Sequence, residues 1–435
     1  MSMRPDIVFD LTEMLLATTG KLRYYGIVRV VAEIGLALAR HDPAIRFCIY
    51  SAGHRRFFEI HPVRDADGTV SFDIPEGVRQ LRIRSVFHQK KPVRDALAVP
   101  FRAIANARNR RAWAKGGVDL PEIPLDGKTY VSCGRPKLMV EQLHAIAHQG
   151  WQVTFIPLLH DMIPLHDYFA HRSKAFPSNF VNDNIYILTR ARAVLTNSGF
   201  TRDELLSFTA NGQLPTLSET AVHAIPLVHE CPRGTEEAEQ LPPDSPYILT
   251  VGATLGRKNL DTVFDAVKTL RKDGKTAPRI VVAGARRHRT EKYLASKEMD
   301  EVRDLVEFYH SPNQTDLVAL YEGAVALVLG SRMEGWGLPA GEALWLGTPV
   351  ICSTAPVLRE VAGDLGLYFD PDRPDELAAH IAHLMDDPEY AKALRARIRA
   401  GHARLRTWDD VARDMLHILA EPREETPSGS PQDID

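Results

Sequence analysis

Residues 331–353 read Ser-Arg-Met-Glu-Gly-Trp-Gly-Leu-Pro-Ala-Gly-Glu-Ala-Leu-Trp-Leu-Gly-Thr-Pro-Val-Ile-Cys-Ser. The stretch carries two carboxylates, Glu334 and Glu342, on either side of a Gly-x-Gly-Leu-Pro break. In one continuous helix, eight steps of ~100° would leave the two side chains about 80° apart. The break argues against one continuous helix, and the two carboxylates are therefore expected on different elements.

The glycine break predicts a loop followed by a new helix. Gly335 and Gly337 both permit positive φ, and Pro339 suits a first helical turn. The first carboxylate is then expected on a loop after the apolar strand 324–330, and the second in the opening turns of the helix. Both would face a cleft at the carboxyl ends of parallel strands, where α/β proteins bind ligands. A carboxylate pair there can accept hydrogen bonds from the hydroxyls of a ribose and of a sugar.

The chain has 435 residues, which exceeds what one hydrophobic core usually serves, so two domains are expected. A net charge of −3 gives no general reason to expect nucleic acid as a partner. The four cysteines are scattered without zinc spacing, which fits a reducing compartment. The first residues do not resemble a signal peptide, and no run approaches about 18 apolar residues. These features predict a soluble, cytoplasmic protein.

Two α/β series follow one another along the chain. The first opens as strand 7–10, helix 27–40 and strand 46–51, an order whose usual outcome is parallel α/β. The polar, proline-rich stretch 229–246 lacks apolar periodicity and is expected to be a linker. Further strands are expected at 129–132, 153–157, 193–197, 247–251, 279–284, 306–309, 349–353 and 366–370, with helices at 259–272 and 315–322.

A basic pair, Arg257-Lys258, lies in Gly-Arg-Lys-Asn-Leu between a strand and a helix. Unpaired backbone N–H groups and the helix dipole attract anions at such a position. Arg257 adds a planar fork suited to phosphate oxygens, and Lys258 adds a compact charge. Together they could hold a diphosphate and stabilise it as a leaving group without a metal. The alternative is a solvated basic pair, but its place one strand end away from the two carboxylates favours the diphosphate site.

These motifs, followed by Gly-Thr-Pro-Val-Ile, resemble the signature of retaining GT-B glycosyltransferases of family 4. The resemblance covers 247–408 and includes Pro-Val-Leu-Arg-Glu at 356–360. It implies a GT-B fold, in which two Rossmann-like doubly wound domains face each other across a cleft. It also implies metal-independent retaining transfer of a hexose from a nucleotide sugar, with no further cofactor. One departure is Leu255-Gly256, where many members carry Glu-Pro.

The resemblance implies a role for each matching residue. Arg257 and Lys258 would bind the donor diphosphate and assist its departure. Glu334 would contact the transferred sugar as a positioning residue, and Glu342 would bind the ribose hydroxyls. Backbone N–H groups of the glycine-rich turn would line the sugar and phosphate pocket, namely those of Gly335, Trp336, Gly337 and Leu338.

Three N-terminal motifs are similar to mannosyltransferase-like members acting in bacterial surface polysaccharide synthesis. They are Gly26-Ile-Val-Arg29, His160-Asp161-x-x-Pro164 and Asn197-Ser198-x-x-Thr201. Gly26 matches a glycine that approaches the donor phosphates, and Arg29 would add a phosphate or acceptor contact. The alternatives of a turn glycine and a surface charge stay open.

His160 is expected at the carboxyl end of a strand, facing the cleft. Its imidazole could hydrogen-bond the sugar or assist the departing phosphate, although a lone histidine is more often structural. Asp161 could act on the acceptor hydroxyl or cap the segment 162–165. The pairs Asp65/Asp67 and Asp370/Asp372 fit a hairpin turn and a helix lead-in better than a metal site.

The segment 90–115 is strongly basic, with apolar residues interleaved and Asp95 as its only acid. It suits either the surface of an anionic membrane or a solvated helix or acceptor-domain loop, and Pro100 is expected to interrupt any continuous helix. Contact with a membrane here would place the protein at the inner face of the plasma membrane.

The sequence therefore predicts a hexosyltransferase of polysaccharide synthesis, with GDP-mannose as the first choice of donor and a glycan or lipid-linked acceptor. Other GDP- or UDP-sugars, a GT-B epimerase or phosphorylase, and a non-catalytic scaffold are the alternatives. The expected organisation is an N-terminal acceptor-side domain (1–228), the linker (229–246), a nucleotide-sugar-binding domain (247–407), a helix crossing back to the first domain (408–420) and a disordered tail (421–435).

Overall fold

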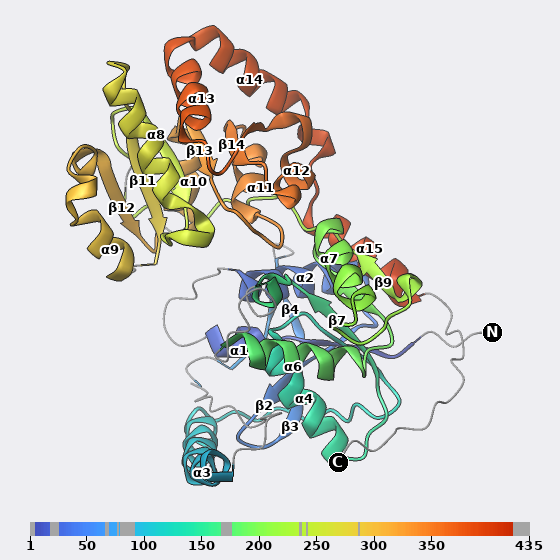
Figure 1. Cartoon of the computed structure of the whole chain (residues 1–435). Helices are drawn as coiled ribbons and strands as arrows, with labels where there is room; N and C mark the ends of the chain where they lie inside the picture. The colour runs from blue at the N-terminus through green and yellow to red at the C-terminus, as the bar shows by residue number, and fades with distance from the viewer. Residues whose placement is uncertain are drawn as a thin grey trace.

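The computed structural model describes residues 5–17, 26–65, 69–75, 78, 92–166, 176–234, 237–240, 242–285 and 288–420. Two sheets, each flanked by helices, form two lobes that follow one another along the chain (Figure 1). The first lobe runs from blue to green and the second from yellow to red. The predicted α/β class with two Rossmann-like units is confirmed. The predicted tail at 421–435 lies outside the described residues.

The first sheet has seven strands in the order β3-β2-β1-β6-β7-β8-β9. Its strands are parallel except for β3, which pairs antiparallel with β2. The sequence patterns located all of these strands except β3 and β9. The strands are β1 (Ile7–Asp10), β2 (Arg46–Ser51), β3 (Arg56–Ile60), β6 (Thr129–Ser132), β7 (Thr154–Leu159), β8 (Val194–Thr196) and β9 (Val222–Ala224).

The second sheet has six parallel strands in the order β12-β11-β10-β13-β14-β15. Residues of its central strands are buried on both faces, as expected for a parallel sheet covered by helices. The strands are β10 (Tyr247–Val251), β11 (Arg279–Gly284), β12 (Val306–His310), β13 (Ala326–Leu329), β14 (Val350–Ser353) and β15 (Leu367–Phe369).

Helices connect the strands and cover the sheets. Those of the first lobe are α1 (Thr12–Ala17), α2 (Ile27–His41), α3 (Pro92–Lys115), α4 (Pro136–His148), α6 (Phe176–Leu188) and α7 (Gly199–Ala210). Those that follow are α8 (Leu260–Lys272), α9 (His288–Leu294), α10 (Gln314–Gly323), α11 (Leu338–Trp345), α12 (Pro356–Ala362), α13 (Pro374–Asp386), α14 (Pro388–Ala400) and α15 (Trp408–Ala420). A small antiparallel pair, β4 (Pro62–Arg64) with β5 (Val70–Phe72), completes the first lobe.

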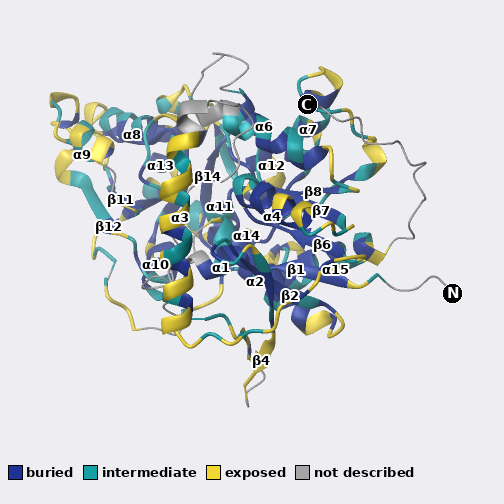
Figure 2. Ribbon diagram, turned by 90° about the horizontal axis from the view of Figure 1, so that it is seen from below, coloured by how far each residue is buried: buried dark blue, intermediate teal, exposed yellow. Residues whose placement is uncertain are grey.

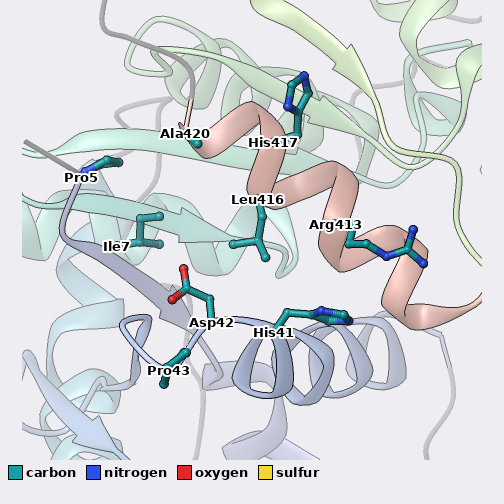
Figure 3. A pocket seen from close by; sticks show the side chains of 9 residues that line it. All are labelled: Pro5, Ile7, His41, Asp42, Pro43, Arg413, Leu416, His417 and Ala420. Atoms are coloured by element: carbon teal, nitrogen blue, oxygen red, sulfur yellow. The ribbon is translucent and has the colours of Figure 1, made fainter. Parts of the chain in front are cut away.

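The last helix, α15, returns to the first lobe and packs against α2. An exposed ion pair joins them, with Arg40 Nη2 2.9 Å from Asp409 Oδ1. A cavity of about 490 Å³ lies where the end of α2 meets α15 and the start of β1 (Figure 3). None of the predicted site residues lines this cavity, so it is separate from the motifs that suggested a donor site.

Pro100 does not interrupt α3, and the expectation that it would do so is wrong. A proline inside a helix removes one hydrogen bond and frees the carbonyl four residues earlier. Ala96 and Pro100 are both exposed, so water can satisfy that carbonyl. Within the described part of the chain, no helix combines the length and apolar character that crossing a membrane requires.

Candidate functional site

The turn between β13 and α11 has the predicted form. The strand ends at Leu329, a loop carries Glu334, and α11 begins at Leu338 with Pro339 in its first turn. Gly337 precedes the helix with φ 105°, a left-handed conformation that favours glycine. The chain therefore reverses here without strain, and it places Glu334 on the loop and Glu342 within the helix.

Gly335 has a different role from the one predicted, because its φ is not positive. A Cβ at this position would lie 1.9 Å from the carbonyl oxygen of His160 and 3.1 Å from the Cβ of Asp161. The side-chain hydroxyl of Thr201 also donates to the carbonyl of Gly335 at 3.3 Å. Glycine is required here by the close approach of two domains, and the loop of Glu334 rests directly on the end of β7.

Glu334 is held by the basic pair that follows β10. Lys258 Nζ lies 2.5 Å from Glu334 Oε1, and Arg257 Nη1 lies 3.3 Å from Oε2. Burial alone would raise the pKa of Glu334, but the charges of Lys258 and Arg257 outweigh burial and lower it. The carboxylate is therefore ionised at neutral pH and fixed between two cations.

The basic pair keeps donors available for a ligand. The Arg257 side chain is 44% exposed and the Lys258 side chain 18% exposed. Arg257 uses only Nη1 within the described structure, on Glu334 and on the Met333 carbonyl at 3.0 Å. A guanidinium has five N–H donors in a planar fork, so the remaining ones can serve an anion.

A second set of donors lies at the start of α11. Among the described residues, none accepts a hydrogen bond from the backbone N–H of Gly335, Trp336, Gly337 or Leu338. The Trp336 side chain is buried and donates through Nε1 to the Val228 carbonyl at 3.0 Å, away from these N–H groups. Unpaired N–H groups at a helix start favour a negatively charged ligand. They follow Glu334 directly in the chain.

Glu342 has a different environment from Glu334. It is 3% exposed, Tyr321 Oη donates to its Oε2 at 2.7 Å, and Arg29 Nη1 donates to its Oε1. Both carboxylate oxygens therefore already have protein partners, one of them from the first lobe. A ribose hydroxyl would have to share these oxygens, so the ribose contact of Glu342 stays a prediction.

Arg29 is not the surface charge that the sequence left open, since it is only 5% exposed. It lies in the first turn of α2 and reaches across to Glu342 in the second lobe. Gly26 precedes α2 with φ 62° and is exposed, which accounts for a glycine there on conformational grounds. Its proposed approach to donor phosphates stays a prediction.

His160 follows β7, as predicted, and its Nε2 donates to the Cys133 carbonyl at 2.7 Å. Burial lowers the pKa of His160, so the ring is neutral near pH 7. With the proton on Nε2, the Nδ1 atom is left as an acceptor. One ring nitrogen of His160 thus has a structural role, and no described residue forms a hydrogen bond with the other.

Asp161 caps the helical turn that follows it, since its Oδ1 accepts from the Ile163 N–H at 3.1 Å. This confirms the capping alternative. Burial raises the pKa of Asp161, although the nearby Arg257 acts in the opposite direction and Glu334 adds to the increase. The close approach of Asp161 to Gly335 places it beside the loop of Glu334, on the side of the first domain.

The motifs at 197–201 and 356–360 meet across the two domains. Glu360 accepts hydrogen bonds from the backbone N–H groups of Gly199 and Phe200, at 2.8 and 3.1 Å. Ser198 caps the same helix by accepting from the Thr201 N–H at 2.9 Å. Both motifs therefore hold α7 against the second domain, beside the loop of Glu334.

The sequence reasoning missed Tyr321 and Glu13. Glu13 has a fully buried side chain, and Arg135 binds both of its oxygens, with Nε 3.0 Å from Oε1 and Nη2 2.5 Å from Oε2. Its charge also acts on His160. An acidic residue just after the first strand was a usable signal for Glu13. No local pattern marked Tyr321, which is brought to Glu342 by the fold.

The described ranges contain no cluster of three or more His, Cys, Asp or Glu side chains that could hold a metal ion. Asp372 Oδ1 is 2.6 Å from Arg332 Nη2, and Asp372 lies just before the start of α13. This position agrees with the predicted lead-in to a helix. Asp65 lies between β4 and β5, and Asp67 falls outside the described residues.

Comparison with protein families and curated proteins agrees with the resemblance. The family described as Glycosyl transferases group 1 matches residues 234–401. The O-antigen chain mannosyltransferase B of Escherichia coli is 28% identical over 240 residues, covering 53% of this chain and 61% of the relative. The O-antigen chain mannosyltransferase RfbU of Salmonella typhimurium is 34% identical over 146 residues, covering 33% of this chain and 39% of the relative. The matches thus span less than two thirds of either relative.

Comparison with solved structures establishes the fold over nearly the whole chain. The sucrose-phosphate synthase of Thermosynechococcus elongatus superposes with a TM-score of 0.63 at 17% identity, covering 95% of this chain and 98% of that one. At this identity the likeness concerns the fold alone. The chain carries a glycosyl transferases group 1 domain at residues 234–401 and has the GT-B fold, as its motifs implied.

Proposed function

We propose that the protein transfers a hexose from a nucleotide diphosphate sugar to a glycan or lipid-linked acceptor in polysaccharide synthesis, with retention of anomeric configuration. The observation that carries the proposal is the contact of Arg257 and Lys258 with Glu334, beside four backbone N–H groups that have no acceptor among the described residues. These cations and N–H groups suit a diphosphate, and the carboxylate suits sugar hydroxyls. One ligand carries both groups, namely a nucleotide sugar.

In the proposed reaction, the acceptor oxygen forms a bond to the anomeric carbon as the bond from that carbon to the diphosphate oxygen breaks. The acceptor proton passes to the departing diphosphate. Arg257 and Lys258 stabilise the charge that develops on this leaving group, so no metal ion is required. Glu334 orients the sugar and forms no bond to it.

His160 and Asp161 approach the same place from the first domain. We assign the free Nδ1 of His160 to a hydrogen bond with the sugar or the departing phosphate. Domain contacts at Gly335 would exclude water and so limit hydrolysis of the donor. Mannose from GDP-mannose is the first choice of donor, supported by the two mannosyltransferases that this chain resembles.

A thermal-shift panel of nucleotides and nucleotide sugars tests the donor. A ligand that binds only the folded state raises the melting temperature, so stabilisation by GDP and not by UDP is the expected result. Stabilisation by UDP alone would indicate a UDP-sugar as the donor instead of a GDP-sugar. Stabilisation by neither nucleotide would contradict the proposal.

The reaction class is tested by release of the nucleoside diphosphate with and without added acceptor. A transferase releases it faster when the acceptor is present. Conversion of the sugar without any acceptor would indicate an epimerase. Binding without turnover under either condition would indicate a non-catalytic scaffold.

A further inference from the structure

Helix α3 is a long surface helix at the end of the first lobe, far from the second lobe in Figure 1. It spans Pro92–Lys115, which is 24 residues or about 36 Å at ~1.5 Å per residue. Figure 2 shows it lying across the surface with most of its described length exposed. The described part of α3 therefore offers an extended face to a partner.

One side of α3 fixes it to the hairpin of β2 and β3. Trp113 is buried, with its ring 4.9 Å from that of Phe58 and 5.3 Å from that of His54. Arg110 Nη1 donates to the Gly53 carbonyl at 2.9 Å. Because this side is anchored, the opposite side points away from the protein in a defined direction.

The outward side carries a single line of residues, which we call the α3 stripe: Leu97, Phe101, Ile104, Arg108, Arg111 and Lys115. At ~100° per residue, all six lie within about 40° of the direction of Leu97. Its first half is apolar and its second half cationic. The stripe is thus arranged along the helix, with an apolar end and a basic end on the same face.

The apolar end is unusually exposed for large side chains. Leu97 and Phe101 are 61% exposed and Ile104 is 57% exposed. These are three of the five exposed large hydrophobic residues among the described parts of the chain, and a fourth, Val99, also lies on α3. Apolar residues gathered on one exposed helix mark an interaction site rather than scattered surface variation.

The basic end is exposed and has no acidic partner among the described residues. No described carboxylate forms an ion pair with Arg108, Arg111 or Lys115. The other exposed arginines of the first lobe include some with acidic partners, such as Arg135 with Glu13 and Arg40 with Asp409. An unbalanced row of cations next to exposed apolar side chains is complementary to a surface that is anionic outside and apolar beneath.

We propose that the α3 stripe docks on an anionic lipid bilayer, with Leu97, Phe101 and Ile104 entering the interface and Arg108, Arg111 and Lys115 contacting lipid phosphates. Amphipathic helices that combine Lys or Arg with exposed Leu and Phe lie in the plane of a membrane interface. Each cation near such a surface adds electrostatic attraction that salt weakens. The inference stands apart from the proposed transferase activity, because it concerns a face outside the donor site.

Vesicle co-sedimentation of the full chain, without donor or acceptor, tests the proposal. The wild type should bind mixed phosphatidylcholine–phosphatidylglycerol vesicles and bind pure phosphatidylcholine vesicles much less. The triple variant R108E/R111E/K115E should weaken binding on the order of a hundredfold or more at low salt. The triple variant L97S/F101S/I104S should also weaken it, and the residual binding should be abolished by salt.

A charge-matched control is K275E/K392E/R397E, which reverses three exposed cations on the second lobe. The control should bind as the wild type does, and all variants should melt at nearly the wild-type temperature because the replaced side chains are exposed. A wild type that does not bind anionic vesicles would overturn the proposal. Vesicle binding by the control that is as weak as binding by the α3 variants would also overturn it. So would self-association of the wild type without lipid, if the α3 variants abolish that self-association.

Discussion

Glu334 and Glu342 are the same residue type, eight positions apart, yet their surroundings differ in kind. Glu334 lies on a loop between two cations that are partly open to solvent, at 44% and 18% side-chain exposure. Glu342 lies inside a helix, enclosed between Arg29 and Tyr321. The first arrangement leaves donors for a ligand, while the second uses both oxygens on the protein itself.

The comparison shows that the two glutamates of one sequence motif have different roles. The loop carboxylate organises a charged site, whereas the helix carboxylate joins the two lobes through a residue 313 positions away in the sequence. An ion pair removed from water contributes little net stability, but losing one partner is costly because the other charge stays buried. The two glutamates should therefore respond differently to the same substitution.

The largest expected effect is on stability at the buried pair. Arg29→Met should lower the free energy of unfolding by about 3–5 kcal/mol, because Glu342 would be left buried without its counter-charge. Urea denaturation measures this. The matched control is Arg40→Met on the same helix, whose partner Asp409 is 46% exposed and whose loss should cost about 1 kcal/mol or less.

A double variant, Arg29→Met with Glu342→Gln, tests whether the two side chains interact. Removing both charges should restore part of the lost stability, giving a favourable coupling in the double-mutant cycle. Additive losses would show that the two side chains do not interact, and would contradict the assigned pair.

Glu334→Gln should act on activity more than on stability. A neutral amide leaves the loop in place but weakens the hydrogen bonds that orient the sugar. Transfer should slow on the order of a hundredfold, because a small misplacement of a substrate commonly costs that much in rate. Steady-state kinetics with the donor identified by the thermal-shift panel provides the measurement. Glu389→Gln, at an exposed position on α14, serves as the control. A fully active Glu334→Gln enzyme would remove the positioning role.

A substitution at Gly335, which contacts the backbone of His160, should have a smaller effect on stability. Gly335→Ala places a methyl group 1.9 Å from a backbone oxygen, which the domains can relieve only by moving apart. We expect a loss of about 1–3 kcal/mol in unfolding free energy together with weaker donor binding. Gly134→Ala is the control, since its Cβ would meet its nearest neighbour at 3.4 Å, an ordinary contact. Equal stability of the two variants would exclude the close approach.

The smallest effect concerns pH. The cations hold the pKa of Glu334 below 4.5 in the folded state, so its ionisation stabilises the fold above pH 4.5. That contribution is lost as the pH falls through the lowered pKa. Urea denaturation at a series of pH values should therefore show a steeper acid loss in the wild type than in Glu334→Gln. Parallel curves would mean that the cations do not act on this carboxylate.

Local patterns in the sequence were sufficient to predict the strands of the second sheet and the loop that precedes the helix at Gly337. They also placed Arg257 and Lys258 beside Glu334, because neighbouring parallel strands bring their carboxyl ends to one edge. Hydrophobic periodicity did not reveal β3 or β9, which are short edge strands. Pro100 was misjudged because its effect depends on the exposure of Ala96, which no local rule contains.

The rest of the site depends on contacts between the lobes. Arg29, Tyr321 and Glu342 come together only when both lobes are folded, and the need for glycine at position 335 arises from the backbone of His160. Sequence spacing carries no information on such contacts without an alignment. The charged half of the site was thus predictable, and its junction with the first lobe was not.

Calorimetric titration with a nucleoside diphosphate and the matching monophosphate tests the central claim most directly. If Arg257 and Lys258 recognise the diphosphate, the wild type should bind the diphosphate at least about tenfold more tightly, since a charge-assisted hydrogen bond contributes ~1.5–3 kcal/mol. Lys258→Met should remove most of that preference while leaving monophosphate binding nearly unchanged. An undiminished preference in Lys258→Met would contradict the assignment of this site to the donor diphosphate.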